Sequence, residues 1–323
     1  MAGVVIVVIA IFLVWSGRGI NIGVINLSVS PEKKLSPIAG LDCEYRDRRP
    51  VAVMLASDPE TRPLSGIGQA DLVVEMPVTP NGITRMMAVY QCQTPNEIGS
   101  IRSARGDFIP LAGGFESLYA HWGGEYDALE QLDRRVIDNV DALKYEGTTF
   151  YRKTTIPRPH NGFSTISRIF DRAIALGYDL NKNFSGYLHS DAPPIRNLSN
   201  IANTVTLNYP ATYNAVWTYD AITNSYLRAR GGGAEVDRNT GEQVRAQVVI
   251  VMHTASGNIR GQYISVNTTG QGTAEVYQNG IRIDGTWKKD PTQLNSKLFF
   301  YDASGKEIPF VSGTIWIEIA TTQ

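Results

Sequence analysis

The sequence has little cysteine, no excess charge of either sign and none of the common cofactor motifs. Two cysteines, Cys43 and Cys92, are the whole complement of 323 residues, and two thiols without nearby paired ligands cannot form a structural zinc site. The chain has no P-loop, no G-x-G-x-x-G and no His-Glu-x-x-His. With 30 Lys+Arg against 31 Asp+Glu, it has a net charge of -1, which provides no global attraction to nucleic acid. The sequence therefore predicts no metal centre, no cofactor and no nucleic-acid partner.

Charge is also missing from the start of the chain. No ionisable side chain occurs between Met1 and Gly17, and Val4 to Trp15 is one apolar run. A signal-peptide core needs ~7–15 apolar residues and a membrane span ~20, and the apolar residues between Ile20 and Leu27 could extend the run past Arg18. We predict that residues 1–20 are a signal anchor, a transmembrane helix that holds the following domains on the extracytoplasmic side of the cell membrane. The alternative is a buried strand or helix of the fold.

The positions of the two cysteines bear on anchoring and on stability. No cysteine directly follows the apolar run, so the sequence contains no lipidation signal and the predicted anchor is a peptide segment. In an oxidising compartment, a bridge between Cys43 and Cys92 would add roughly 4 kcal/mol by the loop-entropy estimate. Two separate buried thiols are the alternative, and the sequence leaves both open.

The length and the composition shifts predict two domains behind a stalk. Residues 21–48, rich in Ser, Pro, Lys and Asp, are predicted to form the stalk. Strands and helices alternate in residues 49–190, which predicts an α/β or α+β layered domain. A proline-containing break at residues 190–200 precedes an all-β domain, residues 201–323. The expected strands are residues 50–56, 71–75, 83–91 and 117–121, then 205–208, 215–219, 225–229, 244–253, 262–266, 274–278, 281–287, 297–301 and 314–319; the expected helices cover residues 125–132 and 164–177.

Ionisable side chains gather at the ends of the apolar strands of the first predicted domain, where α/β sheets place ligand sites. Arg102 and Arg105, three residues apart among small residues, could hold a phosphate, pyrophosphate or carboxylate. The candidate ligand-binding residues are Arg62, Glu75, Arg85, Arg102, Arg105, Arg152 and Asn161, and the candidate catalytic residues are Asp58, His121 and His160. The alternatives are a salt-bridge network that includes Asp58, Glu75 and Asp107, a hydrogen-bonded structural His121, and an Asn161 that only caps a helix.

Several of these segments resemble a known family. They closely resemble the YerB-like family, a domain of unknown function in bacterial lipoproteins and membrane-anchored proteins, and the likeness covers nearly everything after the stalk. The resemblance implies a two-domain extracytoplasmic protein and no known reaction, and this sequence departs from the family in lacking a lipidation signal. The matching segments are residues 49–54, 58–63, 69–75, 82–85, 98–105 and 159–161 in the first domain, and 285–289 and 313–316 in the second.

A shorter likeness concerns wall-glycopolymer ligases of the LytR-CpsA-Psr type. Residues 101–107, followed by Tyr119 to Gly124 and a short helix, are similar to the arginine-bearing unit with which those singly anchored enzymes hold a polyprenyl pyrophosphate. The Asp-Thr-Met segment expected upstream is missing. This likeness implies a glycopolymer phosphotransferase as an alternative function.

Two classes of function follow from these observations. In the first, the Arg-, His- and Asp-rich cleft binds an anionic cell-envelope ligand and, in an enzyme version, His121 or His160 acts as general base with Asp58 orienting it. In the second, the protein is a non-catalytic envelope scaffold whose β domain binds a protein or a glycan. The surface for that binding would come from Trp217, Tyr219, Tyr226, Trp287, Trp316 and a basic tip at Lys288 and Lys289, although most of the aromatic residues could instead fill a core. Convergence of the polar residues in one cleft would favour the first class.

Overall fold

The β-branched and apolar runs form strands close to the predicted positions. The computed structural model describes residues 8–16, 19–27, 34–190, 201–259 and 261–322. The chain has two compact units, residues 1–34 and 35–323. The predicted domain boundary at residues 190–200 lies almost entirely outside the described residues.

The first unit corrects the prediction of a transmembrane helix. β1 (Val8–Ser16) and β2 (Gly19–Leu27) pair as an antiparallel hairpin in which Val8 faces Leu27 and Ser16 faces Gly19. Apolar runs rich in Val and Ile suit strands as well as buried helices, and periodicity alone does not separate the two. Within the described residues, no helix has the length and the apolar character needed to span a membrane.

The centre of the second unit is a mixed sheet to which both halves of the chain contribute strands. In the described part of the chain this sheet has 11 strands, ordered β20-β19-β18-β16-β21-β4-β5-β3-β7-β8, with β17 paired to β16. The last strand pairs in parallel with β4 on one side and β16 on the other, so the two predicted domains share one sheet. The strands are β3 (Val51–Ala56), β4 (Leu72–Pro77), β5 (Thr84–Tyr90), β7 (Leu118–His121), β8 (Asn139–Asp141), β16 (Val248–Ile259), β17 (Tyr263–Val266), β18 (Gly270–Gln278), β19 (Ile281–Lys289), β20 (Phe299–Asp302) and β21 (Ile315–Thr322).

The strand directions bring many strand ends to one edge of this sheet. β7 and β8 run parallel to β3, and β16 and β21 run parallel to β4. Both β3 and β4 are antiparallel to β5, so they run in the same direction. The carboxyl ends of all these strands, and the start of β5, therefore lie along one edge, which we call the carboxyl edge.

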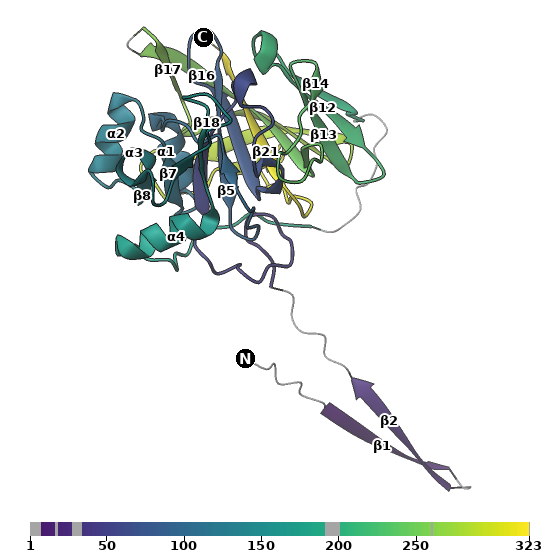
Figure 1. Ribbon diagram of the computed structural model, residues 1–323. Coiled ribbons are helices and arrows are strands. Elements are labelled where there is room, and N and C mark those ends of the chain that lie inside the picture. Colours follow the sequence, from purple (N-terminus) through teal and green to yellow (C-terminus); the bar gives the residue numbers. More distant parts are fainter. Residues whose placement is uncertain (1–7, 17–18, 28–33, 191–200, 260, 323) are drawn as a thin grey trace. The chain divides into compact units, whose positions relative to one another are not determined.

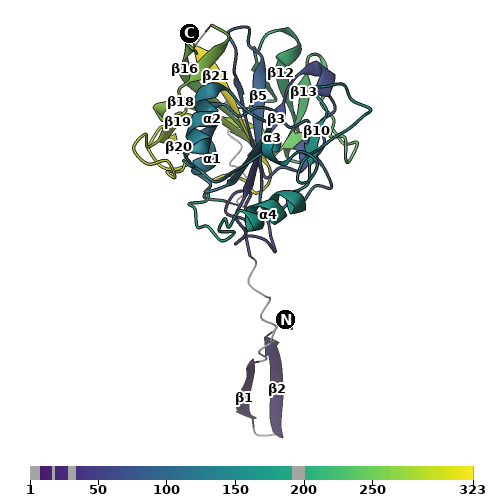
Figure 2. The same cartoon turned by 60° about the vertical axis from the view of Figure 1, so that its left-hand side comes forward.

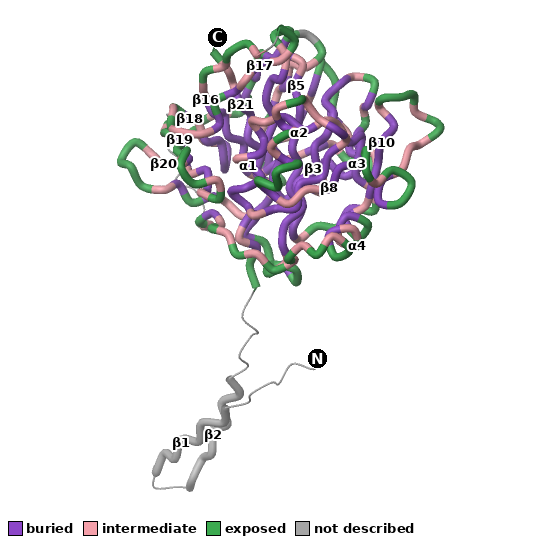
Figure 3. Tube along the Cα trace, turned by 90° about the vertical axis from the view of Figure 1, so that its left-hand side faces the viewer, coloured by how far each residue is buried: buried purple, intermediate pink, exposed green. Residues whose placement is uncertain are grey.

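Different elements cover the two faces of the central sheet. One face packs against α1 (Ile109–Gly113) and α2 (Tyr126–Asp133), and the other against a five-stranded sheet and α4 (Ile166–Ala175). Figures 1 and 2 show α1 and α2 on the opposite side of β5 from β12 and β13. The middle strands are buried along their length, whereas exposed residues lie in the outer loops (Figure 3). The five-stranded sheet contains β11 (Thr204–Leu207), β12 (Ala215–Asp220), β13 (Ser225–Arg230), β14 (Gly233–Ala234) and β15 (Arg245–Ala246); the smaller elements are β6 (Ile98–Gly99), β9 (Tyr151–Arg152), β10 (Gly162–Ser164) and α3 (Ala142–Tyr145).

The end of the predicted stalk belongs to the folded body. Ile38 and Cys43 are buried, and Cys43 forms a disulfide with Cys92 across a sequence separation of 49. The side-chain amide nitrogen of Gln91, Nε2, donates to the carbonyl oxygens of Arg46 and Arg48 at 2.7 and 3.1 Å. The stalk prediction is therefore wrong for residues 35–48, because these long-range contacts are invisible in the local composition.

The second half of the chain is built from strands in its described part, apart from a short 3-10 helix at Ala211–Tyr213, and of the five aromatic residues predicted for a binding surface only Tyr219 stays half-buried. Trp217, Trp287, Trp316 and Tyr226 are fully buried, so the aromatic surface proposed for the scaffold alternative is core instead. Lys289, predicted as part of a basic tip, is also buried, and its ammonium donates to the carbonyl oxygen of Leu294 at 3.1 Å. Burial lowers the pKa of Lys289 to about 8.

A buried charge network joins the two large sheets. Arg228 of β13 reaches Glu75 of β4 at 2.6 Å and Glu318 of β21 at 3.2 Å, and its guanidinium lies 4.1 Å from the ring centroid of Trp316. Arg230 pairs with Glu75 and, at 3.3 Å, with Glu235. Three carboxylates thus surround two arginines in a region without solvent, which leaves one negative charge in excess when all are ionised.

The excess charge is relieved at Glu318. Burial, reinforced by the charge of Glu75, raises the pKa of Glu318 to about 7. Burial also acts on Glu75, but Arg230 and Arg228 outweigh it and lower the pKa of that carboxyl to about 2. A neutral Glu318 leaves two carboxylates with two arginines, which is the balanced state of the network.

The disulfide predicts a stability loss that redox conditions control. Replacing Cys43 and Cys92 together by Ser should lower the free energy of unfolding by about 4 kcal/mol, because opening the loop increases the entropy of the unfolded chain. Urea denaturation of the two proteins without reductant measures the difference. A reductant should bring the wild type down to the variant and leave the variant unchanged. Equal stability of the two proteins under oxidising conditions would contradict this role.

The raised pKa of Glu318 predicts a pH-dependent stability. Between the usual glutamate pKa of ~4.3 and about 7, the folded state binds a proton that the unfolded state does not. The stabilisation of the folded state by this proton is fully present below the unfolded pKa of ~4.3, and it is lost as the pH rises through the folded pKa of about 7. The free energy of unfolding should therefore fall between about pH 4 and 7, and less steeply in Glu318→Gln, as urea denaturation at several pH values will measure. Glu130→Gln, at an exposed position, should keep the wild-type slope; an unchanged slope in Glu318→Gln would contradict the assignment.

Candidate functional site

Arginine side chains from two segments meet a carboxylate from a third at the carboxyl edge. Asp58 follows β3, and its Oδ2 lies 3.1 Å from Nη1 of Arg85, the second residue of β5. Arg102, in the segment after β6, reaches the same Oδ2 at 3.8 Å with Nη2. The phenol of Tyr213 donates to the other oxygen of Asp58 at 3.3 Å. Arg105 joins this group through its charge, which acts on Arg85, and we call Arg85, Arg102, Arg105 and Asp58 the arginine cluster.

The arginine cluster has few acidic partners: Arg85 and Arg102 share the carboxylate of Asp58, and Arg105 faces Glu125. Burial lowers the pKa of Arg85 to about 10; the carboxylate of Asp58 opposes this shift, and the charges of Arg102 and Arg105 add to it. The nearest carboxylate oxygen to Arg105 is Oε2 of Glu125, at 4.0 Å from Nε, and that side chain also accepts from the backbone N–H of Gly106 at 2.7 Å. In the described structure, the buried Nε atoms of Arg85, Arg102 and Arg105 have no hydrogen-bond acceptor.

Two other predicted residues border the arginine cluster. Nη2 of Arg62 donates to the carbonyl oxygens of Ser57 and Thr212 at 2.8 and 2.7 Å, so this side chain ties the residue before Asp58 to the five-stranded sheet region. His160 lies in the loop at residues 157–161, and the carbonyl oxygen of Pro159 in that loop accepts from Nη1 of Arg102 at 3.3 Å. The buried Nδ1 of His160 has no hydrogen-bond partner among the described atoms.

Arg152 and Asn161 form a separate pair. The Oδ1 of Asn161 accepts from Nη1 of Arg152 at 2.9 Å, and its amide nitrogen donates to the carbonyl oxygen of Lys153 at 2.9 Å. Nε of Arg152 donates to Glu146 at 2.8 Å, and the guanidinium stacks 4.0 Å from the ring centroid of Trp122. Both ends of the Asn161 amide are thus bonded to residues 152 and 153, and its oxygen orients Arg152.

His121 is a structural residue, not a general base. It is fully buried; Nδ1 lies 2.8 Å from the carbonyl oxygen of Gly123, and Nε2 lies 3.2 Å from Oδ1 of Asn139. Both ring nitrogens are thus occupied, which agrees with the structural alternative weighed from the sequence.

Glu75 does not belong to the predicted ligand set either, because its carboxylate pairs with Arg228 and Arg230 in the buried network. Its strand position placed it near the edge, but its side chain faces the five-stranded sheet.

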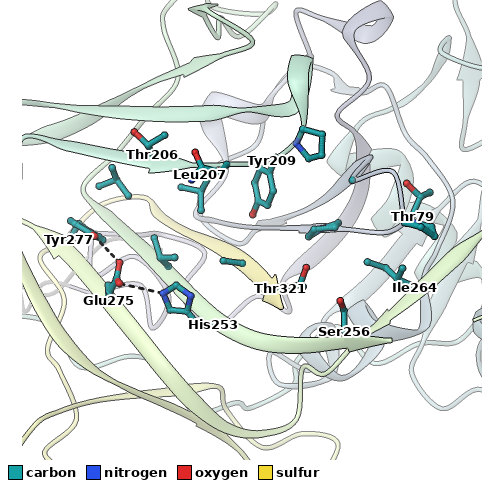
Figure 4. Close-up of a pocket in the computed structure, with 18 of the residues that line it drawn as sticks. Thr79, Thr206, Leu207, Tyr209, His253, Ser256, Ile264, Glu275, Tyr277 and Thr321 are labelled. Atoms are coloured by element: carbon teal, nitrogen blue, oxygen red, sulfur yellow. Dashed lines mark hydrogen bonds and ion pairs between the residues drawn. The ribbon is translucent and has the colours of Figure 1, made fainter. Parts of the chain in front are cut away.

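A cavity at the carboxyl edge escaped the sequence analysis. It has a volume of about 610 Å³ and lies between β11, the β4–β5 turn and the strands β16, β18 and β21. Figure 4 shows His253, Glu275 and Tyr277 on one side of it, with Thr206 and Leu207 across from them. Nε2 of His253 lies 3.3 Å from Oε1 of Glu275, and Tyr277 donates to Oε2 of Glu275 at 2.8 Å. The only signal in the sequence was that Glu275 and Tyr277, two residues apart in a strand, face the same side. Nothing in the local pattern shows that His253, on another strand, lies beside them.

The described residues contain no group of three or more His, Cys, Asp or Glu side chains arranged to hold a metal ion. The chemistry described at the carboxyl edge is that of guanidinium donors and the carboxylates of Asp58 and Glu125 and, in the cavity, of hydroxyl and backbone groups beside the His253–Glu275 pair.

Comparison with known proteins places this architecture in a family. Residues 36–179 match the N-terminal domain and residues 205–317 the C-terminal domain of the family described as "Protein of unknown function (DUF3048)". A Bacillus subtilis (strain 168) protein named "Putative lipoprotein YerB" is 33% identical over 296 residues, which are 89% of this chain and 86% of that protein. A crystal structure of YerB protein from Bacillus subtilis superposes with a TM-score of 0.81 at 30% identity, and the match covers 89% of this chain and 97% of the other. The chain is therefore a member of the DUF3048 family, to which both of its halves belong, and the resemblance to YerB-like proteins is confirmed.

Proposed function

We propose that this protein is a membrane-anchored extracytoplasmic protein that binds a phosphate or carboxylate group of a cell-envelope ligand at the arginine cluster. The observation that carries the proposal is the surplus of buried guanidinium donors. Arg85 and Arg102 share the single carboxylate of Asp58, and each keeps a buried Nε–H without an acceptor. Buried donors without partners are costly, and a bound anion would satisfy those of the arginine cluster.

An anion would satisfy these donors in a way that further protein groups do not. A phosphate or carboxylate oxygen accepts strong, charge-assisted hydrogen bonds from guanidinium groups, and a planar fork suits two oxygens at once. An anion would also reduce the mutual repulsion of Arg85, Arg102 and Arg105, which contributes to the lowered pKa of Arg85. Arg102 is the member through which a ligand would enter, because 16% of its side chain is exposed.

Asp58 acts in this proposal as a positioning residue. Its two oxygens are bound from different sides, by Arg85 and Arg102 at Oδ2 and by Tyr213 at Oδ1. A carboxylate held in this way fixes the two guanidiniums relative to each other and prevents their repulsion from spreading them apart. Two arginines share this one negative charge, while Arg105 faces Glu125.

The similar Bacillus protein and the N-terminal apolar run support this location. The similar Bacillus protein is named a lipoprotein, which is a membrane-attached class. Both cysteines of this sequence are joined in the disulfide, so neither is available for acylation. We assign the attachment to the uncharged apolar residues at the start of the chain, and the disulfide suits the oxidising extracytoplasmic side.

The arginine cluster predicts anion binding that depends on Arg102. Inorganic pyrophosphate and a short-chain polyprenyl phosphate, titrated calorimetrically into the full-length protein in detergent at low salt, should bind the wild type. Arg102→Ala should weaken binding about 10- to 100-fold, because a hydrogen bond to a charged group contributes ~1.5–3 kcal/mol. Binding should also weaken as salt is added.

Arg134→Ala is the matched control, because Arg134 is an exposed arginine that pairs with Glu130 away from the cluster. It should bind as the wild type does. Thermal unfolding of both variants separates a loss of affinity from a loss of structure. The proposal fails if the wild type binds neither anion, or if a folded Arg102→Ala variant binds both as tightly as Arg134→Ala.

A further inference from the structure

The cavity at the carboxyl edge has a wall made from the edge of a strand. Residues Thr204 to Asn208, five in sequence, all line it. A strand seen from its face contributes every second residue, because side chains alternate, whereas its edge contributes consecutive residues. Across the cavity, β16 contributes Val251 and His253 and β18 contributes Glu275 and Tyr277, which is the alternating pattern of a sheet face. The cavity therefore combines a strand edge with a sheet face.

The register of β11 shows which backbone groups lie on that edge. β11 pairs antiparallel with β12, with Val205 opposite Trp217, and within the described residues it has no second strand neighbour. The amide of Tyr219 donates to the carbonyl oxygen of Asn203 at 2.8 Å. In an antiparallel pair, every second residue bonds to its opposite residue through both its N–H and its C=O, and the residues between point both groups away from the partner strand. Asn203, Val205 and Leu207 therefore bond to β12, and the N–H and C=O groups of Thr204 and Thr206 point away from it.

The arrangement of β11 is fixed by the parts around it. Val205 and Leu207 are buried in the core between the two sheets, so the strand cannot rotate its edge away. Beyond the strand, the hydroxyl of Tyr209 donates to the carbonyl oxygen of Ile319 in β21 at 3.1 Å. The β4–β5 turn closes the end: a Cβ on Gly82 would lie 2.3 Å from Cγ of Pro210, so a side chain at that position would not fit.

The lining selects an uncharged occupant. Among the described residues, no Lys or Arg lines the cavity, and the one carboxylate that does, Glu275, is already bonded by His253, Tyr277 and, at 3.4 Å, Arg282. The remaining polar lining consists of hydroxyl side chains, the amide of Asn208 and backbone groups. This cavity is therefore chemically unlike the arginine cluster, and its volume of about 610 Å³ is within the range of sites for small ligands.

We propose that the cavity binds an extended, uncharged peptide segment of three or four residues, which adds to the five-stranded sheet as a strand beside β11. The N–H and C=O groups of Thr204 and Thr206 would bond the peptide backbone, as in other strand-addition complexes. Side chains on one face of the peptide would lie against Tyr277 and Val251, and those on the other would face solvent. Four residues of β11 span about 13 Å at ~3.3 Å per residue, which sets the length of the segment.

The first experiment tests the peptide backbone. A library of acetylated and amidated hexapeptides built from Ala, Val, Thr and Ser is screened by fluorescence anisotropy against the full-length protein in detergent. The best binder is then N-methylated at one residue at a time. Methylation at two alternate residues should weaken binding at least tenfold, and methylation at the residues between them should change it less than twofold. Absence of any binder below 1 mM, or an equal effect at every position, would overturn the proposal.

The second experiment tests the edge of β11. Thr206→Pro removes the N–H that faces the cavity, and an edge strand tolerates proline where that group makes no ladder bond. Thr206→Ala is the matched control, since it changes the same side chain and keeps the N–H. We expect at least a tenfold loss of affinity in Thr206→Pro and less than a twofold change in Thr206→Ala. A folded Thr206→Pro variant with wild-type affinity would mean that the ligand is held by side chains alone; if this variant does not fold, the methylation series decides.

Discussion

The parallel pairing of β21 with β4 is the contact on which the rest of this structure depends. β21 is the last strand of the chain, and it lies between β16 of its own half and β4 of the other half. Its central position converts what are two domains in the family description into one mixed sheet. Because a central strand must satisfy its backbone groups on both sides, neither half completes the sheet without the other.

The same strand brings charge into the interior and determines how that charge is balanced. Glu318 of β21 lies beside Glu75 of β4 in the parallel register, which places two carboxylates next to each other on the face covered by the five-stranded sheet. Arg228 of β13 meets both of them. Two adjacent carboxylates in a dry region cannot both ionise cheaply, so one has a low pKa and the other a raised one. The network joins the two sheets specifically, since any other register would leave a buried charge unpaired.

Two chemically different surfaces result at the carboxyl edge. The arginine cluster presents cationic donors after β3 and at the start of β5, and the cavity beside β11 presents neutral groups. β17 links them: its first residue, Tyr263, lies 4.7 Å below the guanidinium of Arg105, measured from the ring centroid, while its neighbour Ile264 lines the cavity. An envelope ligand that carries both an anionic group and a peptide would have complementary partners on each side of this strand.

The local sequence determined where the strands and helices are, and the tertiary structure decided what their polar residues do. Val, Ile and aromatic runs bounded by Gly, Pro and Asn predicted most strands within a few residues, because periodicity and turn residues are local properties. The clustering of charged residues at strand ends identified Asp58, Arg85 and Arg102 correctly as neighbours. It could not show that Glu75 faces the other side of the sheet, that His121 is bonded at both nitrogens, or that Cys43 draws residues 35–48 onto the body. Each of these outcomes depends on a partner far away in the chain, and the cavity beside β11 arises only when strands from both halves are brought together, so no window of the sequence contains it.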